Sequence, residues 1–260
     1  MPRTQHSPIA AGVALAAAAA VAFGLTTPLV ARAGAGLGPF TASALLYGGA
    51  AILSFLSYPF ADRSGRRLAR PDAPRVALVA LFGAVLAPVL YVAGLGRAGP
   101  VTTSLVLNFE AVFTALFAWL LYREPIGPRV LVAMLLMLSG GALMVEGRSG
   151  GAAPVLGLLA VVAATASWAA DNALSRRLAE ADPTDVVLDK CGLGAAATGG
   201  LALLAGEPAP TQATVAALLA LGATGYGLSL RLYLLAQRRI GAARTGSVFA
   251  TGPFLGAALA

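Results

Sequence analysis

Long apolar segments, separated by short polar loops, constrain this chain more than any other feature of its sequence. A helix that crosses the hydrocarbon core of a bilayer needs about 20 predominantly apolar residues. The sequence divides into nine segments of about that length, at 9–31, 38–60, 76–95, 100–121, 130–147, 154–174, 184–205, 213–236 and 243–260. We therefore predict an all-α membrane protein, a polytopic bundle of about nine transmembrane helices.

The composition supports a lipid-embedded bundle. Hydrophobic residues make up 58% of the chain and charged residues 11%, with a mean hydropathy of +0.81, whereas soluble domains are roughly 25% charged. The 31 glycines predict helices in close contact, because small side chains drive packing where lipid supplies no hydrophobic force. Most prolines stand where segments begin, but Pro88 and Pro253 lie inside segments, so we expect them to interrupt their helices.

The basic residues predict an orientation. Thirteen of the 18 fall in loops on one side of the predicted bundle, and three, namely Arg32, Arg97 and Arg148, fall on the other. Because Lys and Arg are retained in cytoplasmic loops, we predict a multi-pass protein of the plasma (cytoplasmic or inner) membrane with a cytoplasmic N-terminus. The net charge of +7 predicts no nucleic-acid partner, since the charges do not line one face.

The sequence also repeats internally. Residues 241–260 align with residues 99–118 at an offset of 142, and weaker matches follow at offsets of 143 and 145. We predict two five-helix repeats, 1–147 and 154–260. Because each repeat has an odd number of helices, the second repeat enters the membrane from the opposite side and has inverted topology. Inverted repeats are common in secondary transporters. The repeat therefore favours transport.

The fourth segment carries a recognisable motif. Its sequence from Asn108 to Glu124, NFEAVFTALFAWLLYRE, resembles the signature of EamA-type transporters in the drug/metabolite transporter superfamily, and Ser167-Trp168 and Pro253 also resemble family positions. The resemblance covers the whole chain and implies 5+5 inverted helices around a central cavity. It also implies ten helices, so we expect the second repeat to be incomplete, with a tenth helix after Ala260.

An ionisable residue in the middle of the membrane is the strongest site candidate. Glu110 stands about ten residues into the fourth segment, near the midplane. A charge there is costly and normally faces a cavity or a partner. Because burial disfavours the ionised form of a carboxyl group, we expect Glu110 to load and release a proton and so couple transport to a proton gradient. The alternative is a neutral, hydrogen-bonded acid that joins helices.

Two basic residues also fall inside predicted spans. Lys190 and Arg231 could line the cavity or extend to the cytoplasmic interface along their apolar stems. The repeat pairs Lys190 with Tyr47, so both polar tips could face one cavity. A lysine there would attract an anionic or carboxylate-bearing substrate, unless Asp189 neutralises it or pairs with Arg231.

The remaining candidates are weaker. Asp171 and its neighbour Asn172, near the end of the sixth segment, are expected more at the interface than in the cavity. Uncharged and aromatic groups could orient a substrate, but such groups more often join helices or sit in the aromatic belt. The main ones are Asn108, Trp168 and Tyr91. The simplest interpretation of Glu124, beside Arg123, is a residue that forms a salt bridge at the end of the helix.

These features predict a transporter rather than an enzyme. The sequence has no nucleophile elbow, phosphate loop or metal-binding constellation, so we predict no cofactor beyond proton coupling. We expect a secondary-active, proton-coupled or facilitative transporter, and the resemblance implies an exporter of small metabolites, amino acids or drug-like compounds. The predicted partners are a small-molecule substrate and membrane lipid, with a homodimer left open. The alternative is a non-transporting scaffold or partner subunit, which predicts a sealed core without a polar cavity.

Overall fold

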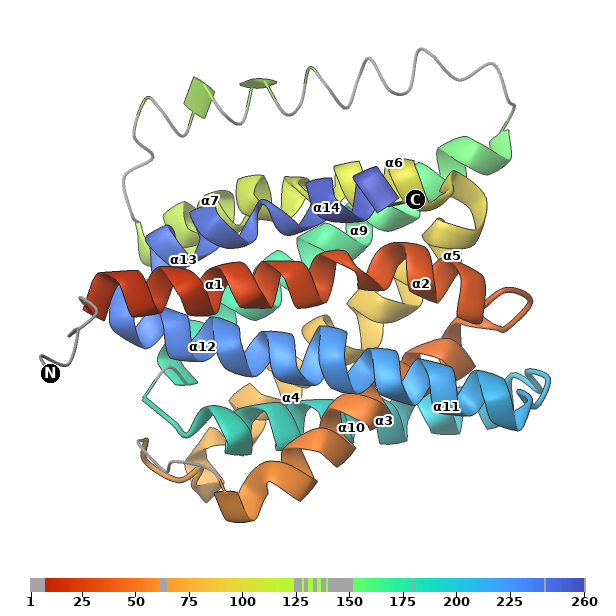
Figure 1. Cartoon of the computed structure of the whole chain (residues 1–260), viewed down its shortest axis with the longest axis horizontal. Coiled ribbons are helices and arrows are strands. Elements are labelled where there is room, and N and C mark those ends of the chain that lie inside the picture. The colour runs from red at the N-terminus through yellow and green to blue at the C-terminus, as the bar shows by residue number, and fades with distance from the viewer. Residues whose placement is uncertain are drawn as a thin grey trace, which may run out of the picture.

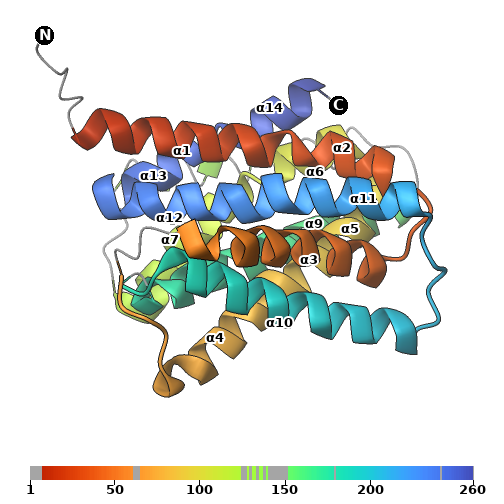
Figure 2. The ribbon, with the colours of Figure 1, turned by 60° about the horizontal axis from the view of Figure 1, so that its bottom comes forward.

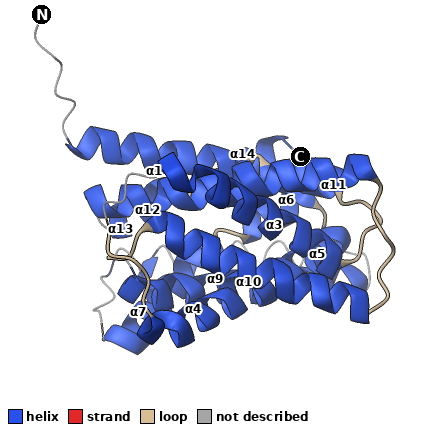
Figure 3. Ribbon diagram, turned by 90° about the horizontal axis from the view of Figure 1, so that it is seen from below, coloured by secondary structure: helices blue, strands red, loops and turns tan. Residues whose placement is uncertain are grey.

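The structure, a computed structural model, is an elongated bundle of helices that run roughly along its long axis (Figures 1 and 2). It describes residues 8–60, 65–123, 152–178, 180–240 and 242–259, with scattered positions between 128 and 139. Within these residues every regular element is a helix (Figure 3), which confirms the predicted all-α class. The predicted fifth segment, residues 130–147, and Glu124 lie largely or wholly outside the described part of the chain.

Seven stretches of the described chain are long and apolar enough to cross a membrane. Those in the first half are formed by α1 (Pro8–Gly24) with α2 (Thr26–Ala33), by α3 (Pro39–Ser57), by η2 (Arg70–Asp72), α4 (Ala73–Ala80), η3 (Leu81–Leu86) and α5 (Ala87–Ala98), and by α6 (Pro100–Val106) with α7 (Phe109–Tyr122). Those in the second half are formed by α9 (Ala152–Ser175), by α10 (Pro183–Leu204), and by α11 (Gln212–Leu221), η5 (Gly222–Leu228) and α12 (Ser229–Ile240). The shorter helices η1 (Tyr58–Phe60), η4 (Arg176–Leu178), α13 (Ala242–Phe249) and α14 (Gly252–Leu259) complete the described elements.

The helices are interrupted at matching places in the two halves. A π-helical turn occurs at η3 and again at η5, and a break at Leu107–Asn108 recurs at Ala250–Thr251, all at separations of 141 to 143 residues. Pro88 follows η3, and Pro253 is the second residue of α14. Both interruptions were expected, because proline lacks an N–H and its ring clashes with the carbonyl four residues earlier. The interruptions fit two repeats, although the division at 147 and 154 stays a prediction.

Glycines bring helices of the two halves into backbone contact. A Cβ atom added at Gly49 on α3 would lie 2.9 Å from Cα of Leu219 on α11, and one added at Gly222 would lie 2.7 Å from Cα of Leu46. Both separations are shorter than real Cβ contacts allow. The expectation that glycine-rich helices pack closely is therefore confirmed at this interface.

One end of the bundle, here called the basic end, is closed by hydrogen bonds between loops. The backbone of Arg66, between α3 and α4, donates to Glu180 O at 3.0 Å and accepts from Asp182 N at 2.9 Å. The Arg66 guanidinium binds the Asp72 carboxylate at 2.5 and 2.9 Å, and this bond raises the pKa of Arg66. Arg238, at the end of α12, donates to a carbonyl of the same 180–182 loop at 2.6 Å.

The opposite end is fastened by a single carboxylate. Glu207 stands in the loop between α10 and α11, and its two oxygens accept hydrogen bonds from the backbone amides of Phe40 at 3.1 Å and Thr41 at 2.7 Å. These amides belong to the first turn of α3, where N–H groups have no partner within the helix. A side chain of the second half therefore caps a helix of the first.

Candidate functional site

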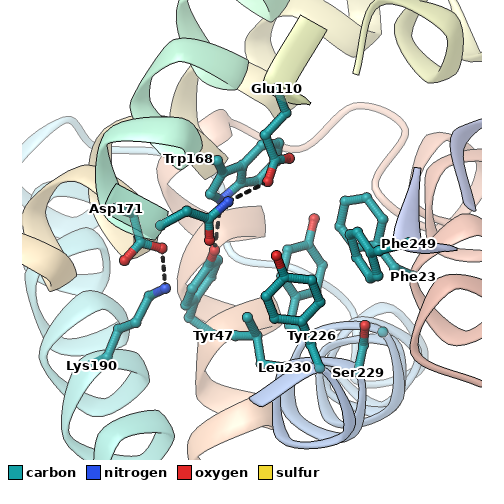
Figure 4. Close-up of a pocket in the computed structure, with 13 residues that line it drawn as sticks. Phe23, Tyr47, Glu110, Trp168, Asp171, Lys190, Tyr226, Ser229, Leu230 and Phe249 are labelled. Carbon is teal, nitrogen blue, oxygen red and sulfur yellow. Dashed lines mark hydrogen bonds and ion pairs between the residues drawn. The ribbon is translucent and has the colours of Figure 1, made fainter. Parts of the chain in front are cut away.

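A cavity lies between the helices, and Figure 4 shows its lining. Its depth follows from Tyr47, Glu110 and Tyr226, which stand near the middle of the spans Pro39–Ser57, Pro100–Tyr122 and Gln212–Ile240. Residues from both halves of the chain line it: Phe23, Tyr47, Glu110, Trp168, Asp171, Asn172, Lys190, Gly225, Tyr226, Ser229, Leu230, Tyr233 and Phe249.

The break between α6 and α7 positions Glu110. Asn108 occupies this break, and both its backbone N–H and its side-chain amide donate to Leu105 O, at 3.2 and 3.1 Å. Glu110 follows in the first turn of α7, where the helix dipole stabilises a negative charge. Its Oε1 accepts a hydrogen bond from Nδ2 of Asn172 on α9 at 2.6 Å (Figure 4). The carboxyl group thus faces the cavity and is held by a neutral amide.

A buried ion pair forms another part of the lining, beside Asn172. The Lys190 ammonium on α10 donates to the Asp171 carboxylate on α9 (Figure 4), and the two residues are 5% and 3% exposed. Ser175 Oγ donates to the second carboxylate oxygen at 3.1 Å. Asp171, expected more at the interface, and Lys190, for which snorkelling was an alternative, are thus both buried in the lining of the cavity. Asp189 is exposed, so it is Asp171 that pairs with the lysine.

The π-helical turn η3 supplies a backbone acceptor next to this pair. The carbonyl of Gly83 accepts hydrogen bonds from the Tyr47 hydroxyl at 2.5 Å and from Trp168 Nε1 at 3.1 Å. A Cβ atom at Gly83 would collide with the Asp171 carboxylate and lie 2.8 Å from Cε of Lys190. A glycine is needed at this position because the ion pair packs directly against the backbone. π-helical turns of this kind are frequent at functional sites.

Aromatic rings make up much of the remaining wall. Phe23 packs against Phe249 and Tyr226 with ring centroids 5.4 and 5.9 Å apart, and Tyr47 lies 5.2 Å from Tyr226. Tyr226 is 3% exposed, and its hydroxyl has no hydrogen-bond partner among the residues that the structure describes. The lining therefore combines polarizable ring faces with a residue whose buried hydroxyl has no hydrogen-bond partner among the described residues.

The other sequence candidates lie outside the lining. Asn108 is buried in the helix break, Tyr91 is buried behind Trp168 with ring centroids 5.5 Å apart, and Arg231 is partly exposed on α12. Lining residues not singled out from the sequence include Phe23 and Phe249. The repeat offered a signal for Phe23, because it aligns with Trp168 at the offset of 145.

Comparisons with known proteins agree with this architecture. The model of the EamA-like transporter family matches residues 10–146 and 155–260. An uncharacterized transporter of Methanothermobacter thermautotrophicus (strain Delta H) is 30% identical over 204 residues, which are 76% of this chain and 59% of that protein. The chain thus spans less than two thirds of that relative's length.

A solved protein structure shares the fold. It is 23% identical to the chain, with a TM-score of 0.72 over 95% of this chain and 86% of its own. Together with the apolar spans and the matching interruptions, the match to the family model over both halves shows that this multi-pass membrane protein belongs to the EamA-like transporter family.

Proposed function

We propose that the protein is a secondary-active transporter that moves small molecules through the mid-depth cavity and couples their movement to protons at Glu110. The observation that carries this proposal is the unequal pairing of the cavity's carboxylates. Asp171 is paired with the ammonium of Lys190, whereas Glu110 is hydrogen-bonded to the neutral amide of Asn172. Glu110 can therefore change its protonation state without leaving a buried cation unpaired.

The groups around Glu110 support proton exchange. Among the residues that the structure describes, the other titratable groups in the lining are Asp171, Lys190, Tyr47, Tyr226 and Tyr233. An asparagine amide serves both states of the acid, because its NH₂ donates to a carboxylate and its oxygen accepts from a carboxylic acid. A proton taken up from water on one side, and released to water on the other, would complete one coupled cycle.

The two ends of the bundle offer closures for alternating access. At the basic end the hydrogen bonds of Arg66 join loops before α4 and before α10, and at the opposite end Glu207 caps α3. Each closure involves segments from both halves, as alternating access by two inverted repeats requires. We propose that the basic end is cytoplasmic, that the N-terminus lies there, and that the protein exports small metabolites, amino acids or drug-like compounds across the plasma membrane.

A non-transporting scaffold fits the cavity less well. That alternative predicts a sealed apolar core, whereas two carboxyl groups and an ammonium group line a cavity at mid-depth. Ionisable residues inside a membrane are costly and normally serve a pathway or a relay.

Transport by reconstituted protein tests the proposal. The protein in liposomes would be given an imposed pH gradient and a mixed panel of amino acids, amines and drug-like compounds, and flux would be measured by mass spectrometry. We expect gradient-driven flux from the parent protein, and from the control Glu180→Gln, whose side chain is exposed. Glu110→Gln should lose the response to the gradient. Equal gradient-driven flux from Glu110→Gln would refute coupling at this residue.

A further inference from the structure

We infer, building on the proposed transport role, that the cavity selects organic monocations, namely protonated amines that carry an aromatic or other apolar group. Three independent features of the cavity support this substrate class: its charge, its aromatic walls and a buried hydroxyl.

The charge of the cavity favours a cation. Lys190 is the one basic residue among the described residues of the lining, and its ammonium is bound by Asp171 in a pair that is almost wholly buried. The charges of this pair sum to zero, so the described lining, when ionised, carries the single negative charge of Glu110. In a medium of low dielectric constant that charge attracts a monovalent cation strongly and repels an anion. The expectation from sequence, an anionic substrate drawn to Lys190, is reversed because the lysine already has its counter-ion.

The aromatic walls suit the same class of ligand. Ring faces attract cations through their negative quadrupole, and they also bury the apolar part of a ligand. Six aromatic side chains line the cavity: Phe23, Tyr47, Trp168, Tyr226, Tyr233 and Phe249. A phenylalkylamine would place its ammonium near Glu110 and its ring among these side chains.

The Tyr226 hydroxyl adds a hydrogen-bonding position. Tyr226 lines the cavity, and its hydroxyl is buried and lacks a partner among the described residues. Buried polar groups normally have partners, and an N–H of a protonated amine would supply one to this oxygen. A quaternary ammonium ion has no N–H to donate, so protonated amines fit this site better.

Four ligands with one carbon skeleton separate the charge classes. Phenethylamine is a cation, phenylalanine a zwitterion, 3-phenylpropionate an anion and 2-phenylethanol neutral. Trp119→Phe leaves Trp168 as the single tryptophan, because the chain has two, and Trp168 lines the cavity. Quenching of its emission in nanodiscs therefore reports binding directly, without relying on transport.

We expect phenethylamine to bind about tenfold more tightly than 2-phenylethanol or phenylalanine, and 3-phenylpropionate most weakly. Glu110→Gln should abolish the preference for the amine, whereas Glu110→Asp, which keeps the charge, should retain it. The double variant Asp171→Asn/Lys190→Met should also retain it, because it removes one charge of each sign. Equal affinity for amine and alcohol, or tightest binding of phenylalanine, would overturn the inference.

Binding and flux distinguish this inference from the proposed function. Selective amine binding with no flux of any panel compound would refute transport and support the cation site. If flux depends on Glu110 but the binding assay shows no preference for amines, the result would support transport and overturn the cation site.

Discussion

The backbone contact between α3 and α11 gives a quantitative prediction for Gly49→Ala. The added methyl group would collide with the carbonyl oxygen of Leu219 and lie 2.8 Å from its carbonyl carbon, whereas ordinary contacts begin near 3.4 Å. The two helices would have to separate by at least about 0.6 Å, and overpacking of this kind costs about 1–3 kcal/mol. Backbone atoms cannot rotate out of the way as a side chain can. We expect Gly49→Ala to lower the free energy of unfolding by that amount.

The neighbouring residue provides a matched control. A Cβ atom at Gly48 would meet its nearest neighbour, Cδ2 of Leu219, at an ordinary 3.6 Å. Both substitutions replace a glycine by alanine in the same helix and so share the same gain in helix propensity. The difference between their free energies of unfolding therefore isolates the effect of the clash. Unfolding in mixed micelles, followed by circular dichroism during detergent titration, would measure both, and a difference below about 0.5 kcal/mol would refute the reasoning.

Two further substitutions test contacts on either side of the site. Glu207→Ala should destabilise the protein by about 1 kcal/mol through loss of the α3 cap, measured by the same titration against the exposed control Gln212→Ala; equal stability of the two would contradict the capping role. Trp168→Phe should lower the free energy of unfolding by about 1–3 kcal/mol, because Gly83 O and the Tyr47 hydroxyl lose a buried donor. Its control is Trp119→Phe, at a residue that is 50% exposed, which should lower that free energy by less than about 0.5 kcal/mol. Similar losses from the two tryptophan substitutions would show that the indole N–H contributes little.

Much of the fold could be predicted from the sequence because the membrane imposes strong rules on it. Spans need about 20 apolar residues and glycines mark close contacts, and both patterns are confirmed where the structure describes the chain. The depth of Glu110 followed from simple counting along its segment. Pro88 and Pro253 correctly located two interruptions, since proline disrupts a helix wherever it occurs in the interior.

The pairing inside the cavity could not be predicted in this way. Lys190 and Asp171 belong to neighbouring spans, and only the rotation of α9 against α10 decides that their side chains meet. Asp171 stands four residues before the end of α9, so a linear count places it near the interface. Phe23 and Phe249 look like ordinary apolar residues until the helices that carry them converge. Hydropathy gives the position of a residue along its helix but not the direction in which it points.

The glycine contacts between α3 and the α11–η5 segment also limit how the bundle can move. No side chain separates Gly49 from Leu219, or Leu46 from Gly222, so these helices cannot slide past one another without a collision of backbones. We expect them to stay in contact at these glycines, although they come from different halves of the chain. We expect a change of shape to bend the bundle elsewhere, and the helix interruptions at Leu107–Asn108 and Ala250–Thr251 are where we expect hinges.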